Sequence, residues 1–149
     1  KEKMQDELSL YMNNMLFFCT KSFSNFPDFN VSQGEIKTTT KIENNKVIFN
    51  VVYPVSVSKG GKTYSFEKFN AEAPVRLGLI YDISEKIMQE QMKHEEDICM
   101  TCLSDLAFDN SLYIDMADYE NNSVLFIITD EKSQINEYYY SFSFVNKYV

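Results

Sequence analysis

The chain has 149 residues and a formal net charge of −8, because 22 acidic side chains outnumber 14 basic ones. Nucleic acid is therefore excluded as an expected partner, since binding to phosphates requires clustered lysine and arginine, and the lysines here are scattered singly. An apolar fraction of 44% indicates a globular protein, and no apolar run approaches the roughly 20 residues that a membrane-spanning helix needs.

The first half predicts one helix followed by strands. Apolar residues recur every three or four positions from Lys3 to Phe23, which is typical of an amphipathic helix. The period then changes to two, and alternation between Val47 and Val57 predicts a strand with one buried face. Gly60-Gly61 predicts a tight hairpin of the primed type, leading to a strand that ends near Val75.

The second half predicts two helices and then three strands. One helix starts near Leu79, and a second runs from Ile98 to Leu106. The three strands are expected at Leu112–Ala117, Val124–Thr129 and Tyr138–Asn146. Across both halves the core is expected to include Val47, Phe49, Val51, Val55, Phe126 and Ile128.

An internal repeat is the most informative feature of the sequence. Residues 43–49 and 120–126 share a Glu-Asn-Asn turn followed by an apolar strand, and residues 64–66 match residues 140–142 at nearly the same offset. The pattern predicts a single α+β domain over residues 1–149, with pseudo-repeats of about 3–76 and 77–149. The expected fold is a duplicated α-β-β-β unit with antiparallel sheets and helices packed on the apolar face.

The three cysteines and the single histidine leave several kinds of site open. Cys99 and Cys102 form a C-x-x-C, but the acidic residues 95–97 before it would raise the pKa of a thiol, which disfavours redox chemistry. A zinc site would combine this pair with His94 and Cys19. Three buried free cysteines, packing as small apolar residues, are a further alternative.

A structural disulfide of Cys102 with Cys19 or Cys99 is favoured if the domain lies outside the cytoplasm. Residues three apart in a regular helix do not readily reach disulfide geometry. We therefore expect Cys19 to pair with Cys102 across the pseudo-symmetry axis, leaving Cys99 free.

Candidate binding residues come from one arginine and one tyrosine cluster. Arg76, the sole arginine, is expected to form an ion pair with a helix acid, with a ligand contact as the alternative. Tyr138, Tyr139 and Tyr140 place rings on both faces of the last strand, where they are expected to line the main groove. The sequence predicts no catalytic residue, no metal site and no cofactor.

Five segments of the chain resemble a known group of proteins. Residues 53–57 (Tyr-Pro-Val-Ser-Val), 59–62, 73–81, 128–136 and 144–148 are similar to the C-terminal region of uncharacterised, membrane-anchored proteins of DPANN-type archaea. The resemblance implies a transmembrane helix upstream of Lys1 and a domain displayed outside the cytoplasm. A start at lysine rather than methionine fits a fragment or a processed form. The resemblance implies no activity.

The predicted function is that of a non-enzymatic, extracytoplasmic binding or assembly module in a membrane-anchored protein. Its expected partner is a protein, a cell surface or a second copy of the chain, and its contact with the membrane is through the upstream anchor alone. The alternative is a thiol- or metal-dependent extracytoplasmic enzyme that uses Cys99, Cys102 and His94. A third hypothesis is a domain that only dimerises its parent.

Overall fold

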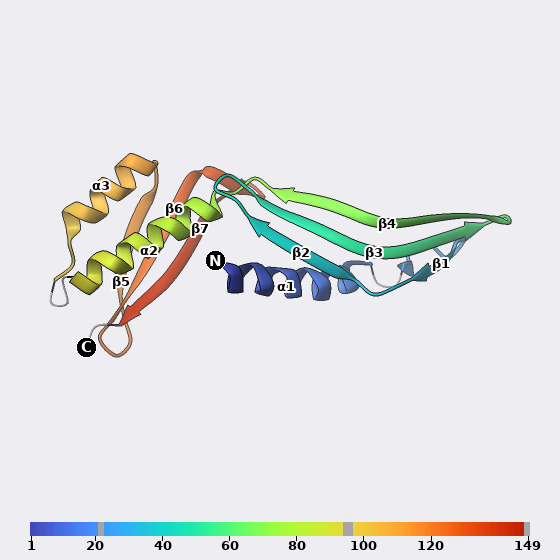
Figure 1. Ribbon diagram of the computed structural model, residues 1–149, viewed down its shortest axis with the longest axis horizontal. Helices are drawn as coiled ribbons and strands as arrows, with labels where there is room; N and C mark the ends of the chain where they lie inside the picture. The colour runs from blue at the N-terminus through green and yellow to red at the C-terminus, as the bar shows by residue number, and fades with distance from the viewer. Residues whose placement is uncertain (21–22, 94–96, 148–149) are drawn as a thin grey trace. The chain divides into compact units, whose positions relative to one another are not determined.

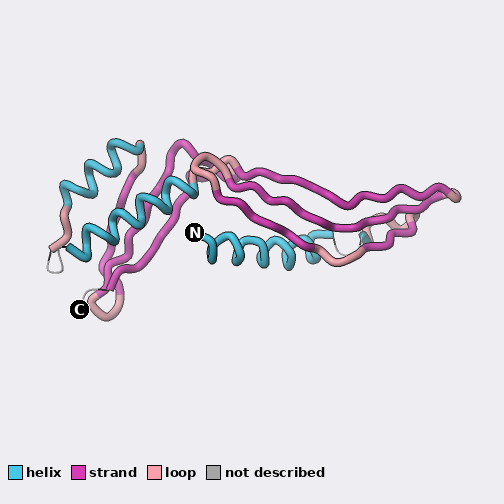
Figure 2. The backbone as a smooth tube through the Cα atoms, viewed as in Figure 1, coloured by secondary structure: helices cyan, strands magenta, loops and turns pink. Residues whose placement is uncertain are grey.

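The computed structural model describes residues 1–20, 23–93 and 97–147, which form an α+β fold of two compact units (Figures 1 and 2). The first unit comprises residues 1–42 and 48–73, and the second begins at residue 74 and also includes residues 43–47. Each unit holds one antiparallel sheet with helical cover. No helix within these described ranges has the length and apolar character needed to cross a membrane.

The long strand β3 is the centre of the first unit. It pairs with β4 along one edge and with the two short strands β1 and β2 along the other. The register of β1 runs antiparallel from Asn30 opposite Ser58 to Gln33 opposite Val55. Strand β1 was not predicted from the sequence, because four residues of mostly polar character carry no periodic signal. The elements are α1 (Glu2–Thr20), β1 (Asn30–Gln33), β2 (Lys37–Ile42), β3 (Val47–Lys59) and β4 (Lys62–Ala73).

Helix α1 runs alongside strand β2 and bonds to its backbone through a polar stripe. Gln5, Ser9 and Asn13 are spaced by one helical turn. Their side-chain oxygens accept the N–H groups of Ile42, Thr40 and Thr38, at 2.8, 3.0 and 2.8 Å. These N–H groups lie on every second residue of a strand at the sheet edge. The helix therefore satisfies donors that an open edge would present to other chains.

The core of the first unit lies on one face of β3. Val51, Tyr53 and Val55 are buried whereas Val52 and Pro54 are exposed, so the predicted alternation is confirmed. Phe49 is only partly buried against this cluster, so its predicted burial is not confirmed. Val47, the first residue of β3, is buried as predicted but belongs to the second unit. By contrast, α1 has no fully buried residue and β4 is exposed along most of its length.

The second unit places two helices on one face of a three-stranded sheet, in the order β5-β6-β7 (Figure 1). Ile80, Ile83 and Ile87 of α2 pack with Leu103 of α3 against Phe126 and Ile128 of the central strand β6. The predicted burial of Phe126 and Ile128 is confirmed. The elements are α2 (Leu77–Lys93), α3 (Met100–Asn110), β5 (Tyr113–Tyr119), β6 (Ser123–Ile135) and β7 (Tyr138–Lys147).

The two units share one strand arrangement. In each, a central strand of 13 residues, β3 or β6, lies between the strand before it and the strand after it. Gly60 and Gly61 have φ of 57° and 77°, and Asn136 and Glu137 close the equivalent turn with φ of 50° and 71°. These positive values confirm the predicted primed hairpin at Gly60-Gly61. Among the residues that the structure describes, strand β1 and the second helix, α3, have no counterpart in the other unit.

Candidate functional site

Arg76 immediately precedes α2 and is held inside the second unit. Its Nε donates to Oδ2 of Asp130 at 2.8 Å, and its Nη2 pairs with Oδ1 of the same carboxylate. Nη1 and Nη2 also donate to the carbonyl oxygens of Asn110 and Ser111, both at 3.1 Å. Arg76 therefore forms an internal ion pair, which was the first of the two alternatives predicted for it. The predicted acid is wrong, however, because Asp130 lies on strand β6 and not on a helix.

The carboxylate of Asp130 is fully buried at a bulge in the β6–β7 ladder. Besides Arg76, it accepts hydrogen bonds from the hydroxyl of Ser133 and from the backbone N–H of Lys132. Burial by itself raises the pKa of Asp130, but these hydrogen bonds and the charge of Arg76 together hold that pKa below its ordinary value. The cluster is a closed structural network that ties the start of α2 to β6.

The tyrosines of β7 divide between the core and the surface. Tyr140 packs with Phe142 and Phe144 against the core cluster, and burial raises its pKa. Tyr138 is 79% exposed and Tyr139 is 52% exposed. Tyr138 lies opposite the exposed Ile135 across the β6–β7 hairpin. The outward aromatic surface of this strand is therefore limited to two tyrosines beside one isoleucine.

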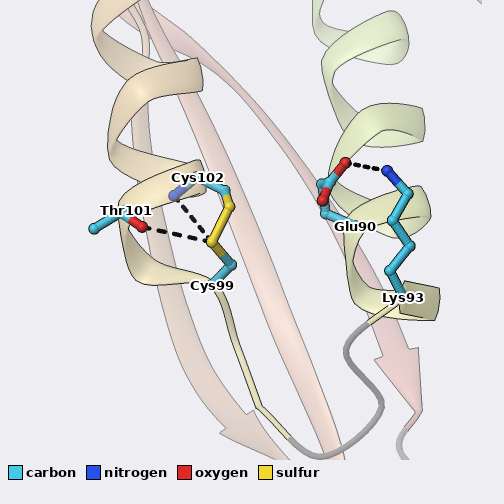
Figure 3. Close-up of a disulfide and its surroundings, with 5 residues drawn as sticks. All are labelled: Glu90, Lys93, Cys99, Thr101 and Cys102. Atoms are coloured by element: carbon cyan, nitrogen blue, oxygen red, sulfur yellow. Dashed lines mark hydrogen bonds and ion pairs between the residues drawn. A yellow bond between two sulfur atoms is a disulfide. The ribbon is translucent and has the colours of Figure 1, made fainter.

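The cysteines are arranged differently from the prediction. Cys99 and Cys102 form a disulfide with Cα atoms 5.3 Å apart (Figure 3). Cys19 is a free, exposed thiol on α1. The expected Cys19–Cys102 bond is wrong. A bond between Cys99 and Cys102 was not expected, because both cysteines were predicted to lie within a regular helix. Cys99 instead lies outside α3 at its N-cap, with φ −70° and ψ 88°, and this backbone brings the two sulfurs together.

A metal site that uses both C-x-x-C thiolates is incompatible with this bond, because disulfide sulfurs are not thiolate ligands. His94 lies outside the described residues. Within the described ranges, no group of three His, Cys, Asp or Glu side chains is arranged to hold a metal ion. The cysteines therefore offer disulfide chemistry at Cys99 and Cys102.

An apolar groove of about 450 Å³ lies in the first unit, between α1 and the sheet face formed by β3 and β4. Because α1 bonds to the edge of β2 through its polar stripe, its apolar stripe reaches over the sheet without filling the space. None of the described residues that line the groove is charged. They are Met12, Leu16, Thr20, Phe23, Val51, Tyr53, Val55, Val57, Phe66, Phe69, Asn70 and Ala71.

The position of this groove differs from the prediction. It is partly aromatic, as expected, but its rings come from residues 23, 53, 66 and 69 rather than from the last strand. Phe66 and Phe69 form an exposed wall on β4, 55% and 43% exposed. The sequence predicted a strand through these aromatic residues but assigned them neither to the core nor to a binding surface. The core lies on β3, and β4 is left open.

No family model, no curated protein sequence and no solved structure matches the chain.

Proposed function

We propose that this chain is a non-enzymatic, extracytoplasmic binding or assembly module of a membrane-anchored protein, and that the groove of the first unit receives apolar side chains of a protein partner. The observation that carries the proposal is the groove itself. Its volume of about 450 Å³ falls within the roughly 300–1,000 Å³ of protein binding pockets. A folded domain seldom leaves such a space next to its core unless something else fills it.

The lining argues for the class of partner. With no charged side chain among the described lining residues, the groove has nothing to neutralise a phosphate, a carboxylate or an ammonium group. Its wall of Phe66 and Phe69 resembles protein interfaces, where aromatic residues are enriched and charges are depleted at the centre. Leucine, phenylalanine or methionine side chains of a partner fit this chemistry.

The disulfide between Cys99 and Cys102 supports the extracytoplasmic part of the proposal. Disulfides, whether structural or redox-active, persist in the oxidised form mainly in oxidising compartments, because thioredoxin and glutathione keep cytosolic thiols reduced. The membrane anchor rests on the resemblance of the sequence alone. Expression of the full-length gene product with a reporter fused to this domain, followed by protease accessibility of intact cells, tests both points.

The groove is tested with a hydrophobic dye and a substitution that fills it. Ala71 lines the groove and is exposed, so Ala71→Trp adds bulk there without removing a core contact. The chain has no native tryptophan, so the indole fluorescence of the variant reports this position alone. We expect saturable binding of 8-anilinonaphthalene-1-sulfonate to the parent chain and at least tenfold weaker binding to Ala71→Trp.

Lys68→Trp is the matched control, because Lys68 lies on the same strand, is exposed and does not line the groove. It should bind the dye as the parent does. Equal loss in both variants, or loss in neither, would place dye binding elsewhere and contradict the groove as a binding site. Sedimentation over a range of protein concentrations then identifies a second copy as the partner if the parent self-associates and Ala71→Trp does not.

A further inference from the structure

Cys99 and Cys102 lie at the start of an 11-residue helix, where the backbone favours a thiolate. The N–H of Cys102 donates to Sγ of Cys99 with an N–S distance of 3.3 Å, and Thr101 Oγ1 is 3.5 Å from the same sulfur (Figure 3). The carbonyl of Cys99 accepts the first helical hydrogen bond, from Leu103. Unpaired N–H groups and the helix dipole at such a position stabilise negative charge on a cysteine sulfur.

The described acid that is nearest to Cys99 in the sequence does not remove this preference. Asp97, two residues before Cys99, is exposed, so water and salt screen its charge. The N–H of Cys102 contacts the Cys99 sulfur directly. Redox chemistry was disfavoured from the sequence because the acidic residues 95–97 precede the pair, and of these three only Asp97 lies within the described residues. In the structure the first cysteine is the N-cap, which is where a reactive thiol is expected.

The bond is also poorly suited to a purely structural role. Only two residues separate the cysteines, and the stabilisation that a disulfide provides by restricting the unfolded chain grows with the length of the loop it closes. The second unit already has a contiguous core of Ile80, Ile83, Ile87, Leu103, Phe126 and Ile128. Both cysteines are only partly buried, and their neighbours Met100 and Thr101 are exposed, so the bond lies close to the surface.

We propose that Cys99–Cys102 is a redox-active disulfide that exchanges with the thiols of another protein. A partner thiolate attacks Sγ of Cys99 and forms a mixed disulfide, and the electron pair of the broken bond leaves on Sγ of Cys102, which takes up a proton. A second thiolate of the partner attacks its own sulfur in the mixed disulfide and expels Cys99 as a thiolate. The partner dithiol is oxidised by two electrons and Cys99 and Cys102 are reduced; the reverse reaction reduces a partner disulfide.

The geometry predicts an order between the two sulfurs. Cys99 receives the N–H bond as a thiolate, so it is the sulfur that forms the mixed disulfide and the faster nucleophile in the reduced state. Cys102 lies within the first turn next to the buried Leu103 and resolves the intermediate. The exchange needs neither the groove of the first unit nor His94. It adds a redox activity in the second unit to the binding proposed for the first, so the non-enzymatic description then applies to the groove alone.

The test uses the full chain with Cys19→Ser, so that no third thiol reacts. The protein is equilibrated in buffers of reduced and oxidised glutathione, quenched with acid, alkylated and analysed by mass spectrometry. We expect the Cys99–Cys102 disulfide to be reduced to two thiols in millimolar glutathione. Circular dichroism should show that the protein stays folded. A bond that reduced glutathione opens only after urea unfolding would be structural and would overturn the proposal.

The order of the sulfurs is measured on two further variants of this Cys19→Ser chain. We expect the thiol left in Cys102→Ser to form a mixed disulfide with oxidised glutathione at least tenfold faster than the thiol left in Cys99→Ser. Equal or reversed rates would contradict the assigned roles. If a variant does not fold, the same comparison is made on the reduced Cys19→Ser chain with limiting iodoacetamide and peptide mapping. Cys99 should then be alkylated first, and preferential alkylation of Cys102 would overturn the proposal.

Discussion

The hydroxyl oxygen of Ser9, on α1, accepts the backbone N–H of Thr40, on β2, at 3.0 Å. The two hydroxyls of this pair are also within 2.9 Å of each other, and Thr40 is buried. The contact is the middle one of three that join the polar stripe of α1 to the edge of β2. It fixes the position of α1 relative to the sheet, and α1 forms one side of the groove.

Ser9→Ala tests whether this contact holds α1 against β2. The substitution leaves the N–H of buried Thr40 without its acceptor, and we expect it to lower the free energy of unfolding by about 1–2 kcal/mol. Amide hydrogen exchange at Thr40 should accelerate by tenfold or more, as measured by NMR. Asn14→Ala, at an exposed position of the same helix, is the control for helix propensity and should leave Thr40 unchanged. Unaltered protection of Thr40 in Ser9→Ala would contradict the role assigned to the stripe.

Asp130→Asn tests the buried network of the second unit. The amide removes the negative partner of Arg76 while keeping the size of the side chain, and removing one member of a buried ion pair typically costs about 3–5 kcal/mol. We expect a loss near the lower end, because the arginine is partly exposed. Urea unfolding gives the value. Asp115→Asn, at an exposed position of β5, is the matched control and should change stability by less than about 0.5 kcal/mol.

The same pair predicts how stability depends on pH. The pKa of Asp130 is lowered in the folded protein, so the folded state binds this proton less readily than the unfolded chain does. Its stabilising contribution is complete above the ordinary value of 3.8 and is lost as pH falls through the lower folded-state pKa. Urea unfolding at several pH values should show a constant gap between the parent and Asp130→Asn at neutral pH. The gap should close below about pH 4. A gap that stays constant at acid pH would show that the carboxylate is not the source of the difference.

Phe126→Ala tests the core of the second unit. The ring is fully buried and stacks on Phe144 with centroids 5.1 Å apart. Removing a buried phenylalanine side chain typically costs about 3–5 kcal/mol, from lost burial and from the cavity left behind. Thermal and urea unfolding should both report this loss. Phe108→Ala is a same-type control at a position 86% exposed and should be nearly neutral. Similar effects of the two substitutions would contradict the assignment of the core.

Several features of the protein were determined by the sequence alone, because they depend on neighbouring residues. The alternation in β3 predicted which of its residues are buried, and Gly60-Gly61 predicted a primed turn, since positive φ is inexpensive for glycine. The matching segments at 43–49 and 120–126 each contain a turn and the first residues of a central strand, and the two strands are of equal length. In each case the residues that carry the sequence pattern lie within a few positions of the strand or turn that the pattern predicts.

Only the tertiary structure decided which distant groups meet. Arg76 pairs with Asp130 across 54 positions, and no local pattern distinguishes this acid from the other acidic residues of the chain. The periodicity of α1 indicated its apolar face but not that a polar stripe would attach the helix to an edge strand and leave a groove beside it. The C-x-x-C spacing was visible in the sequence, but the bond depended on the φ and ψ of Cys99. Local periodicity reports how a segment folds, whereas pairing depends on how the chain brings separate segments together.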